Sequence, residues 1–110
     1  IIDVEPGQPI LDFKVGGVSG PALRPIACRC IYDVYKAVKI PIIGCGGVTY
    51  GTDALQLMMA GAQAVEIGTG IYYRGVEVFK KVTDEIKEYM ERKNYGSLGD
   101  IIGLTHKLEG

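Results

Sequence analysis

The fold of this chain is decided by the stretch Ile40-Pro41-Ile42-Ile43-Gly44-Cys45-Gly46-Gly47. Its first six residues are apolar and largely β-branched, which is typical of a strand buried on both faces inside a parallel sheet. The glycine pair then ends the strand. A second short apolar run, Ala64-Val65-Glu66-Ile67, ends in the same way at Gly68-Thr69-Gly70. The sequence therefore predicts two buried strands, each followed by a glycine-rich loop.

Helical periodicity surrounds these two strands. Apolar residues recur at helical spacing over residues 22–38, over 52–60, and along a longer segment that includes Val76 and Met90. The opposite face of the longer segment is expected to be solvated, because it carries the charged residues Lys80, Lys81, Asp84, Glu85, Lys87, Glu88, Glu91 and Arg92.

Local signals predict where several elements begin and end. Thr49 or Thr52 is expected to cap the second helix, and Gly61 is expected to end it. The run Ser97-Leu98-Gly99-Asp100 resembles a capping box that opens a short last helix. Residues 1–18 are rich in Gly and Pro, and we expect a loop there with one short extended segment around Ile10 to Val15.

The alternation of helices and apolar strands predicts an α/β fold with a parallel sheet and right-handed crossovers. Two strands cannot close a barrel, which typically takes about 250 residues, whereas this chain has 110. We therefore expect residues 1–110 to form the C-terminal segment of one (β/α)8 TIM barrel domain whose upstream part is absent. Such a segment would expose the strand edge that pairs with the missing part. The abrupt start without a methionine agrees with this expectation.

Composition and charge argue against several classes of protein. A net charge of −1 with no basic stripe makes nucleic acid an unexpected partner. A hydrophobic content of 47% is too high for a disordered chain. No apolar run approaches the roughly 20 residues that a membrane span needs, and the first residues do not resemble a signal peptide. We expect a cytoplasmic protein without a membrane partner.

The three cysteines, Cys28, Cys30 and Cys45, show no spacing of a disulfide framework. Cys28 and Cys30 could begin a zinc site, but the chain has one histidine and no second cysteine pair. We predict buried or half-buried free thiols in a reducing compartment, and no metal site.

Three glycine-rich loops, at residues 16–20, 44–47 and 68–70, are the candidates for ligand binding. The last two follow the carboxyl ends of the predicted strands, where parallel α/β folds bind their ligands. Glycine lets backbone N–H groups approach a phosphate, and the N-terminus of a following helix adds positive charge. Tight turns would explain either loop alone. Two in succession favour a phosphate site, and Thr69 could add a hydroxyl donor.

Several motifs taken together resemble the dihydroorotate dehydrogenase family over nearly the whole chain. They are Gly17-Val18-Ser19-Gly20-Pro21-Ala22-Leu23-Arg24-Pro25, Ile40-Pro41-Ile42-Ile43-Gly44-Cys45-Gly46-Gly47-Val48, Ala60-Gly61-Ala62 and Val65-Glu66-Ile67-Gly68-Thr69-Gly70. The run Ser19-Gly20-Pro21-Ala22 is similar to the cytosolic class 1 enzymes, and among these most similar to the catalytic subunit of the NAD-linked type.

The resemblance implies FMN-dependent oxidation of dihydroorotate to orotate in pyrimidine biosynthesis. It implies that Gly20 lies beside the flavin-ribityl region and that Gly46, Gly47, Gly68 and Thr69 hold the FMN phosphate. It further implies a homodimer that works with a separate FAD and iron–sulfur subunit. In the family a cysteine on an earlier loop removes a proton while the flavin accepts a hydride, and the substrate-binding Asn residues and a flavin-facing Lys also lie upstream.

No catalytic residue is assigned within this chain. Cys45 lies inside a predicted phosphate loop, where its backbone matters more than its thiol. His106 follows the last predicted helix and has no carboxylate to orient it, which favours a surface or packing role over a general base. Tyr72 and Tyr73 are expected to pack the start of the long helix against the barrel rather than to stack on a flavin. The alternatives are a phosphate-binding barrel of another class, such as a sugar-phosphate isomerase or lyase, and a non-catalytic half-barrel module.

Overall fold

Two parallel strands form the centre of the fold. The computed structural model describes residues 1–110, and in it β3 (Ile43–Cys45) pairs in parallel with β4 (Ala64–Glu66). Ile43 lies opposite Ala64, and Cys45 lies opposite Glu66. The predicted pairing is confirmed, but β3 begins three residues later than expected. Pro41 has no N–H to give to a strand ladder, which explains the late start.

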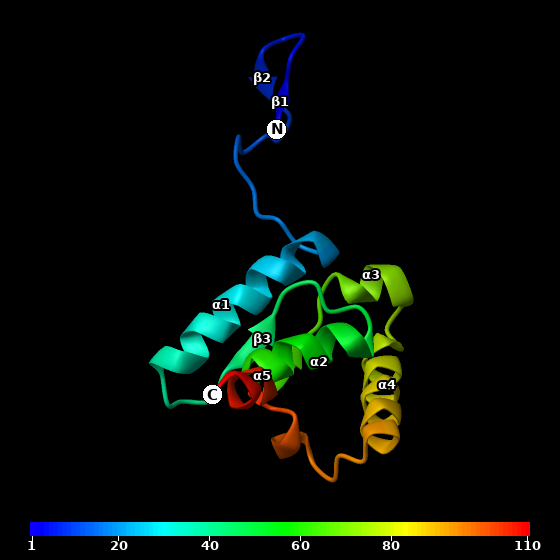
Figure 1. Ribbon diagram of the computed structural model, residues 1–110. Helices are drawn as coiled ribbons and strands as arrows, with labels where there is room; N and C mark the ends of the chain where they lie inside the picture. Colours follow the sequence, from blue (N-terminus) through cyan, green and yellow to red (C-terminus); the bar gives the residue numbers. More distant parts are fainter.

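Three main helices cover these strands. A 3-10 turn, η1 (Pro21–Leu23), leads into α1 (Arg24–Ala37), while α2 (Gly51–Ala60) connects the two strands and α4 (Val78–Lys93) follows them. Figure 1 shows α2 between α1 and α4, and α2 packs against both. The β3–α2–β4 unit is the strand–helix–strand arrangement of a parallel barrel.

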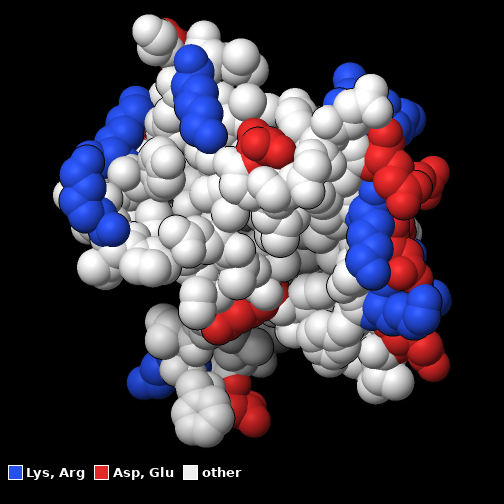
Figure 2. Space-filling model, turned by 90° about the horizontal axis from the view of Figure 1, so that it is seen from below, with Lys and Arg blue, Asp and Glu red and all other residues white.

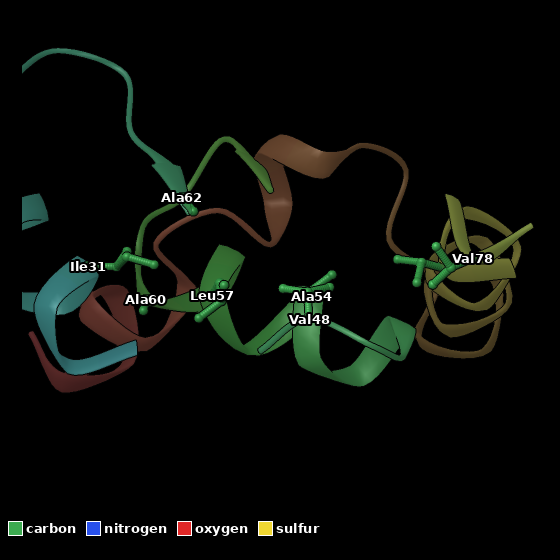
Figure 3. Packing of buried hydrophobic residues seen from close by; sticks show 8 residues of the cluster. Ile31, Val48, Ala54, Leu57, Ala60, Ala62 and Val78 are labelled. Carbon is green, nitrogen blue, oxygen red and sulfur yellow. The ribbon is translucent and has the colours of Figure 1, made fainter. Parts of the chain in front are cut away.

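The core is centred on α2. Leu57 and Ala54 are fully buried, as is Val78 of α4. Figure 3 shows Ile31 of α1 at one end of this cluster and Val78 at the other, with the α2 residues between them. A smaller cluster of Leu55, Met58 and Ile101 joins the C-terminal segment to the same helix. Because α2 packs against α1, α4, α5 (Leu104–Glu109) and β4, its position is fixed, and so are the points where the loops at its two ends begin.

The predicted long helix is in fact two helices. α3 (Gly70–Arg74) ends at Gly75, which has a φ of 76°, and α4 starts three residues later. The last segment also differs from the prediction. Ser97 and Asp100 do form a capping box, but it opens the 3-10 turn η2 (Leu98–Asp100). The final helix, α5, begins only after Gly103. The left-handed φ of 71° at Gly103 separates α5 from η2, so the two do not form one helix.

The N-terminal arm stands away from the body of the molecule (Figure 1). It contains an antiparallel pair, β1 (Ile2–Asp3) and β2 (Gln8–Pro9). The expectation of an extended segment around Ile10 to Val15 was wrong, since the hairpin forms earlier. Gly7 makes the turn with a φ of 69°, and its N–H donates to the carbonyl of Asp3 at 2.9 Å.

The outer surface of α4 is charged, as predicted. Figure 2 shows acidic and basic side chains side by side along the margin where α4 lies. Lys80 and Asp84 form one exposed ion pair at 2.6 Å. No helix is long and apolar enough to span a membrane.

The strand edges and the thiols are more exposed than in a closed domain. The sheet contains only β3 and β4, so one edge of each strand is unpaired, and Ile43 is 61% exposed. All three cysteines are free, but only Cys28 is half-buried, while Cys30 and Cys45 are exposed. The prediction of buried or half-buried thiols was therefore wrong for Cys30 and Cys45.

Candidate phosphate-binding site

A small cavity lies where the two strands end. Its volume is about 130 Å³, and three loops and the ends of both strands surround it. The lining residues are Ser19, Gly20, Leu23, Cys45, Gly46, Gly47, Val48, Glu66, Gly68, Thr69 and Gly70. All five residues expected to bind the cofactor line this one cavity, including Gly20 from the loop that no predicted strand precedes.

Several backbone N–H groups in these loops form no hydrogen bond within the protein. The N–H groups of Gly46, Gly47, Gly68 and Thr69 donate to no acceptor within the chain. Gly46 is buried, Gly47 and Thr69 are half-buried, and Gly68 is exposed. A buried N–H is normally paired, so the Gly46 donor in particular favours a ligand that accepts hydrogen bonds, and the other three lie beside it around the same cavity. A phosphate, with several negatively charged oxygens, matches such a set of donors.

Glycine is required at position 47 for a reason that the sequence did not reveal. Gly47 has a φ of 73°, and a Cβ there would lie 2.8 Å from both the Gly20 carbonyl oxygen and the Arg24 Cβ. A side chain would therefore enter the protein, not the cavity. Gly68 differs, because a Cβ at this position would meet nothing within 4 Å. The two glycines thus allow two distinct tests of the site.

The start of α2 is held by a carboxylate. Asp53 accepts hydrogen bonds from the N–H groups of Thr49 and Tyr50, at 3.0 and 2.8 Å. The expectation that Thr49 or Thr52 caps this helix was wrong, since Tyr50 is the N-cap residue and Asp53 accepts from the backbone. The same carboxylate offsets the positive charge of the α2 N-terminus. Free loop amides are therefore the main donors for an anion.

Two arginine–carboxylate pairs tie the three loops together. Arg24, just after the first loop, contacts Asp53 at 2.9 Å. Arg74, just after the third loop, donates to the Thr49 carbonyl at 2.9 Å and to Glu85 at 2.8 and 3.0 Å. Glu85 in turn accepts from the N–H of Gly51 at 3.0 Å. Both pairs converge on the segment that begins α2.

Glu85 is held in its charged form by these contacts. The hydrogen bond from Arg74 lowers the pKa of the Glu85 carboxyl, the Gly51 N–H adds to this, and partial burial opposes it. A lowered folded-state pKa means that the pair stabilises the fold above the unfolded-state pKa. That stabilisation is lost as the pH falls through the folded-state value.

Glu85→Gln is therefore expected to lower the free energy of unfolding at pH 7 by up to about 1 kcal/mol. The difference in free energy of unfolding between the variant and the wild type should shrink as the pH falls below about 4.3, the ordinary pKa of a Glu carboxyl. Thermal midpoints of both proteins between pH 7 and the acid range measure this. Glu88→Gln is the control, because Glu88 lies on the same helix and forms no ion pair. A difference that does not change with pH would contradict the assignment.

One lining residue was not expected. Glu66 lies opposite Cys45 in the strand pair, and both line the cavity. No ion pair forms at Glu66, so its carboxylate is free to accept hydrogen bonds from a ligand's hydroxyl groups. The only signal for Glu66 in the sequence was its position as the next-to-last residue of the predicted strand, just before a glycine loop.

The remaining candidates lie outside the cavity. His106 lies within α5 rather than after it, stacked between the rings of Tyr32 and Tyr35 at centroid distances of 4.3 and 4.6 Å. Its Nε2 lies 2.8 Å from the Ala60 carbonyl oxygen, which confirms a packing role. Tyr72 and Tyr73 are 84% and 57% exposed in this segment and do not line the cavity, and their packing against the rest of the barrel stays a prediction.

Two parallel strands joined by a helix, with a small cavity at their carboxyl ends, are the arrangement found in β/α barrels. Comparison with known proteins shows which family of barrel proteins the chain belongs to. The family model for dihydroorotate dehydrogenase matches residues 1–90, and the chain belongs to that family. The structure is similar to the crystal structure of the Eimeria tenella dihydroorotate dehydrogenase in complex with ferulenol, with a TM-score of 0.79 and 36% identity. The match covers 88% of this chain and 27% of that one, and the fold is thus part of a TIM barrel.

Curated relatives carry a more detailed name. The chain is 48% identical to the "Dihydroorotate dehydrogenase B (NAD(+)), catalytic subunit" of Pyrococcus horikoshii over 97% of its own length. It is 47% identical to the protein of the same name from Methanosarcina acetivorans, again over 97%. The chain spans about a third of the length of these relatives, 35% and 34% respectively.

Proposed function

We propose that this chain supplies the phosphate-binding loops of an FMN site in an enzyme that oxidises dihydroorotate to orotate. The observation that carries the proposal is the cavity in which Gly20, Gly46, Gly47, Gly68 and Thr69 meet. Membership of the dihydroorotate dehydrogenase family favours this function over a sugar-phosphate isomerase or lyase, and over a non-catalytic module.

The size of the cavity limits which part of FMN it can hold. Sites for whole ligands of drug size measure about 300–1,000 Å³, and this one measures about 130 Å³. It suits a phosphate and the neighbouring ribityl chain, with Glu66 as an acceptor for hydroxyl groups. FMN, when bound, supplies the hydride acceptor of the reaction. The loops of this chain fix its phosphate end, and the ring and the substrate require further protein.

The names of the relatives support a proposal about partners. Because they are catalytic subunits of an NAD-linked enzyme, we propose that electrons from dihydroorotate pass to NAD through a separate FAD and iron–sulfur subunit. The resemblance further implies a homodimer of the catalytic subunit, working in the cytoplasm.

A chimeric holoenzyme tests the cofactor assignment. In it, this chain replaces the matching segment of the Pyrococcus horikoshii catalytic subunit, and bound flavin is measured by absorbance. The chimera should bind FMN, and Gly68→Ala should weaken binding about tenfold, the equivalent of one hydrogen bond to a charged group. Gly17→Ala is the matched control, since its Cβ also meets open space but lies outside the cavity. Absence of flavin from the chimera, or equal affinities for the two variants, would refute the assignment.

A further inference from the structure

We propose that Arg24 and Asp53 are positioning residues, which clamp the loop of residues 46–50 against Gly20 so that its free amides stay directed at the phosphate. The inference rests on the proposed FMN site and adds to it two side chains that do not line the cavity. Neither residue needs to touch the cofactor for this role.

Asp53 joins three segments through one carboxylate. Its Oδ1 pairs with Nη1 of Arg24 at 2.9 Å, while its Oδ2 accepts the Thr49 and Tyr50 N–H groups. The Asp53 side chain is 8% exposed and the Arg24 side chain 29%. A partly buried ion pair is screened less than a surface pair, so this contact is suited to hold the loop.

Arg24 lies where the first two loops meet. The Cα of Gly47 approaches so closely that a Cβ would lie 3.0 Å from the Arg24 amide nitrogen and 2.8 Å from the Gly20 carbonyl oxygen. The guanidinium reaches from this point of contact to Asp53 and the loop beyond it. Loss of the pair would therefore release both sides of the Gly20–Gly47 contact, and the cavity would no longer be fixed.

A simple helix cap is the competing explanation for Asp53. Arg24→Gln separates the two roles, because it leaves both backbone hydrogen bonds to Asp53 in place and removes only the ion pair. If Asp53 merely caps α2, FMN affinity should not depend on Arg24. If the pair is a clamp, affinity should fall even though α2 remains capped.

The experiment compares FMN affinity in the chimeric holoenzyme and three variants. Arg24→Gln should raise the Kd for FMN about tenfold or more, since misplacing binding groups by about 1 Å can cost up to ~10²-fold. Arg24→Lys should restore part of the affinity, because the charge is kept. Arg29→Gln is the control, since Arg29 and Asp33 form an exposed pair at 2.8 Å on the same helix. At saturating FMN, kcat should return to the parent value.

Thermal midpoints without FMN show whether a variant fails simply because it unfolds. Should Arg24→Gln not fold, the comparison of Arg24→Lys with Arg29→Gln decides the question instead. Affinity equal to that of the Arg29→Gln control, or a kcat that stays low at saturating FMN, would overturn the clamp. Failure of the parent chimera to bind FMN would instead refute the proposed function, and the clamp with it.

Discussion

Mixed with FMN and dihydroorotate, the 110-residue chain is expected to give no measurable orotate, whereas the chimeric holoenzyme should turn over. The cavity can hold only the phosphate end, so the isoalloxazine ring would remain unpositioned. Positioning of reactants can account for about 7–11 kcal/mol of a barrier. Absence of the proton-abstracting base adds a typical loss of about 10²–10⁴-fold.

The assay follows reduction of a dye acceptor by dihydroorotate, with equal molar amounts of the chain and of the chimera. FMN is present in excess in both, so that weak cofactor binding by the short chain does not decide the result. The control is the chimera without dihydroorotate, which reports reduction of the dye that does not depend on substrate.

Turnover by the chain at a rate near that of the chimera would contradict this reasoning, and would mean that a residue of this chain acts as the base. Cys45 would then be the first candidate, because it is exposed and lines the cavity. Cys45→Ser in the chain would test it directly. A loss of that turnover would assign the base, and the phosphate loop would then have a chemical role.

The arrangement of the strands and loops could be predicted from local patterns. Two apolar β-branched runs with a helix between them allow few arrangements other than parallel neighbours, so residues 43–45 and 64–66 pair as expected. Elements that depend on backbone turns were harder to place. Gly75 and Gly103 both adopt a positive φ that divides a predicted continuous segment, and periodicity alone cannot distinguish such a glycine from a tolerated one.

The residues that line the site were predictable, but the contacts that hold them in place were not. Glycines at strand ends identified the loops, because parallel strands bring their carboxyl ends to one edge. Arg24, Asp53, Arg74 and Glu85 gave no such signal, since both of their ion pairs join residues of different helices that lie far apart in the sequence. A charged residue on an amphipathic helix is usually solvated. These four are partly buried instead, because α2 packs against α1 and α4.

Gly47→Val should remove most of the flavin from the chimeric holoenzyme. The φ of 73° at position 47 is unfavourable for a β-branched residue such as Val. Its Cβ would also meet backbone, the Gly20 carbonyl oxygen at 2.8 Å, which cannot rotate away as a flexible side chain could. The loop must therefore move, and one or two hydrogen bonds to the phosphate are lost. At about 1.5–3 kcal/mol each, these bonds correspond to a loss of roughly tenfold to more than a hundredfold in affinity per bond.

The measurement is flavin bound per chain after purification, with the fold checked by circular dichroism. Gly17→Val is the matched control, because the same side chain is added to a neighbouring glycine loop where a Cβ meets nothing within 4 Å. Gly68→Ala should show a smaller loss than Gly47→Val, since a methyl group there fits without moving the backbone. A folded Gly47→Val protein with full flavin content would show that the loop of residues 46–50 does not bind the phosphate, and would leave the Gly68–Thr69 loop as the remaining candidate.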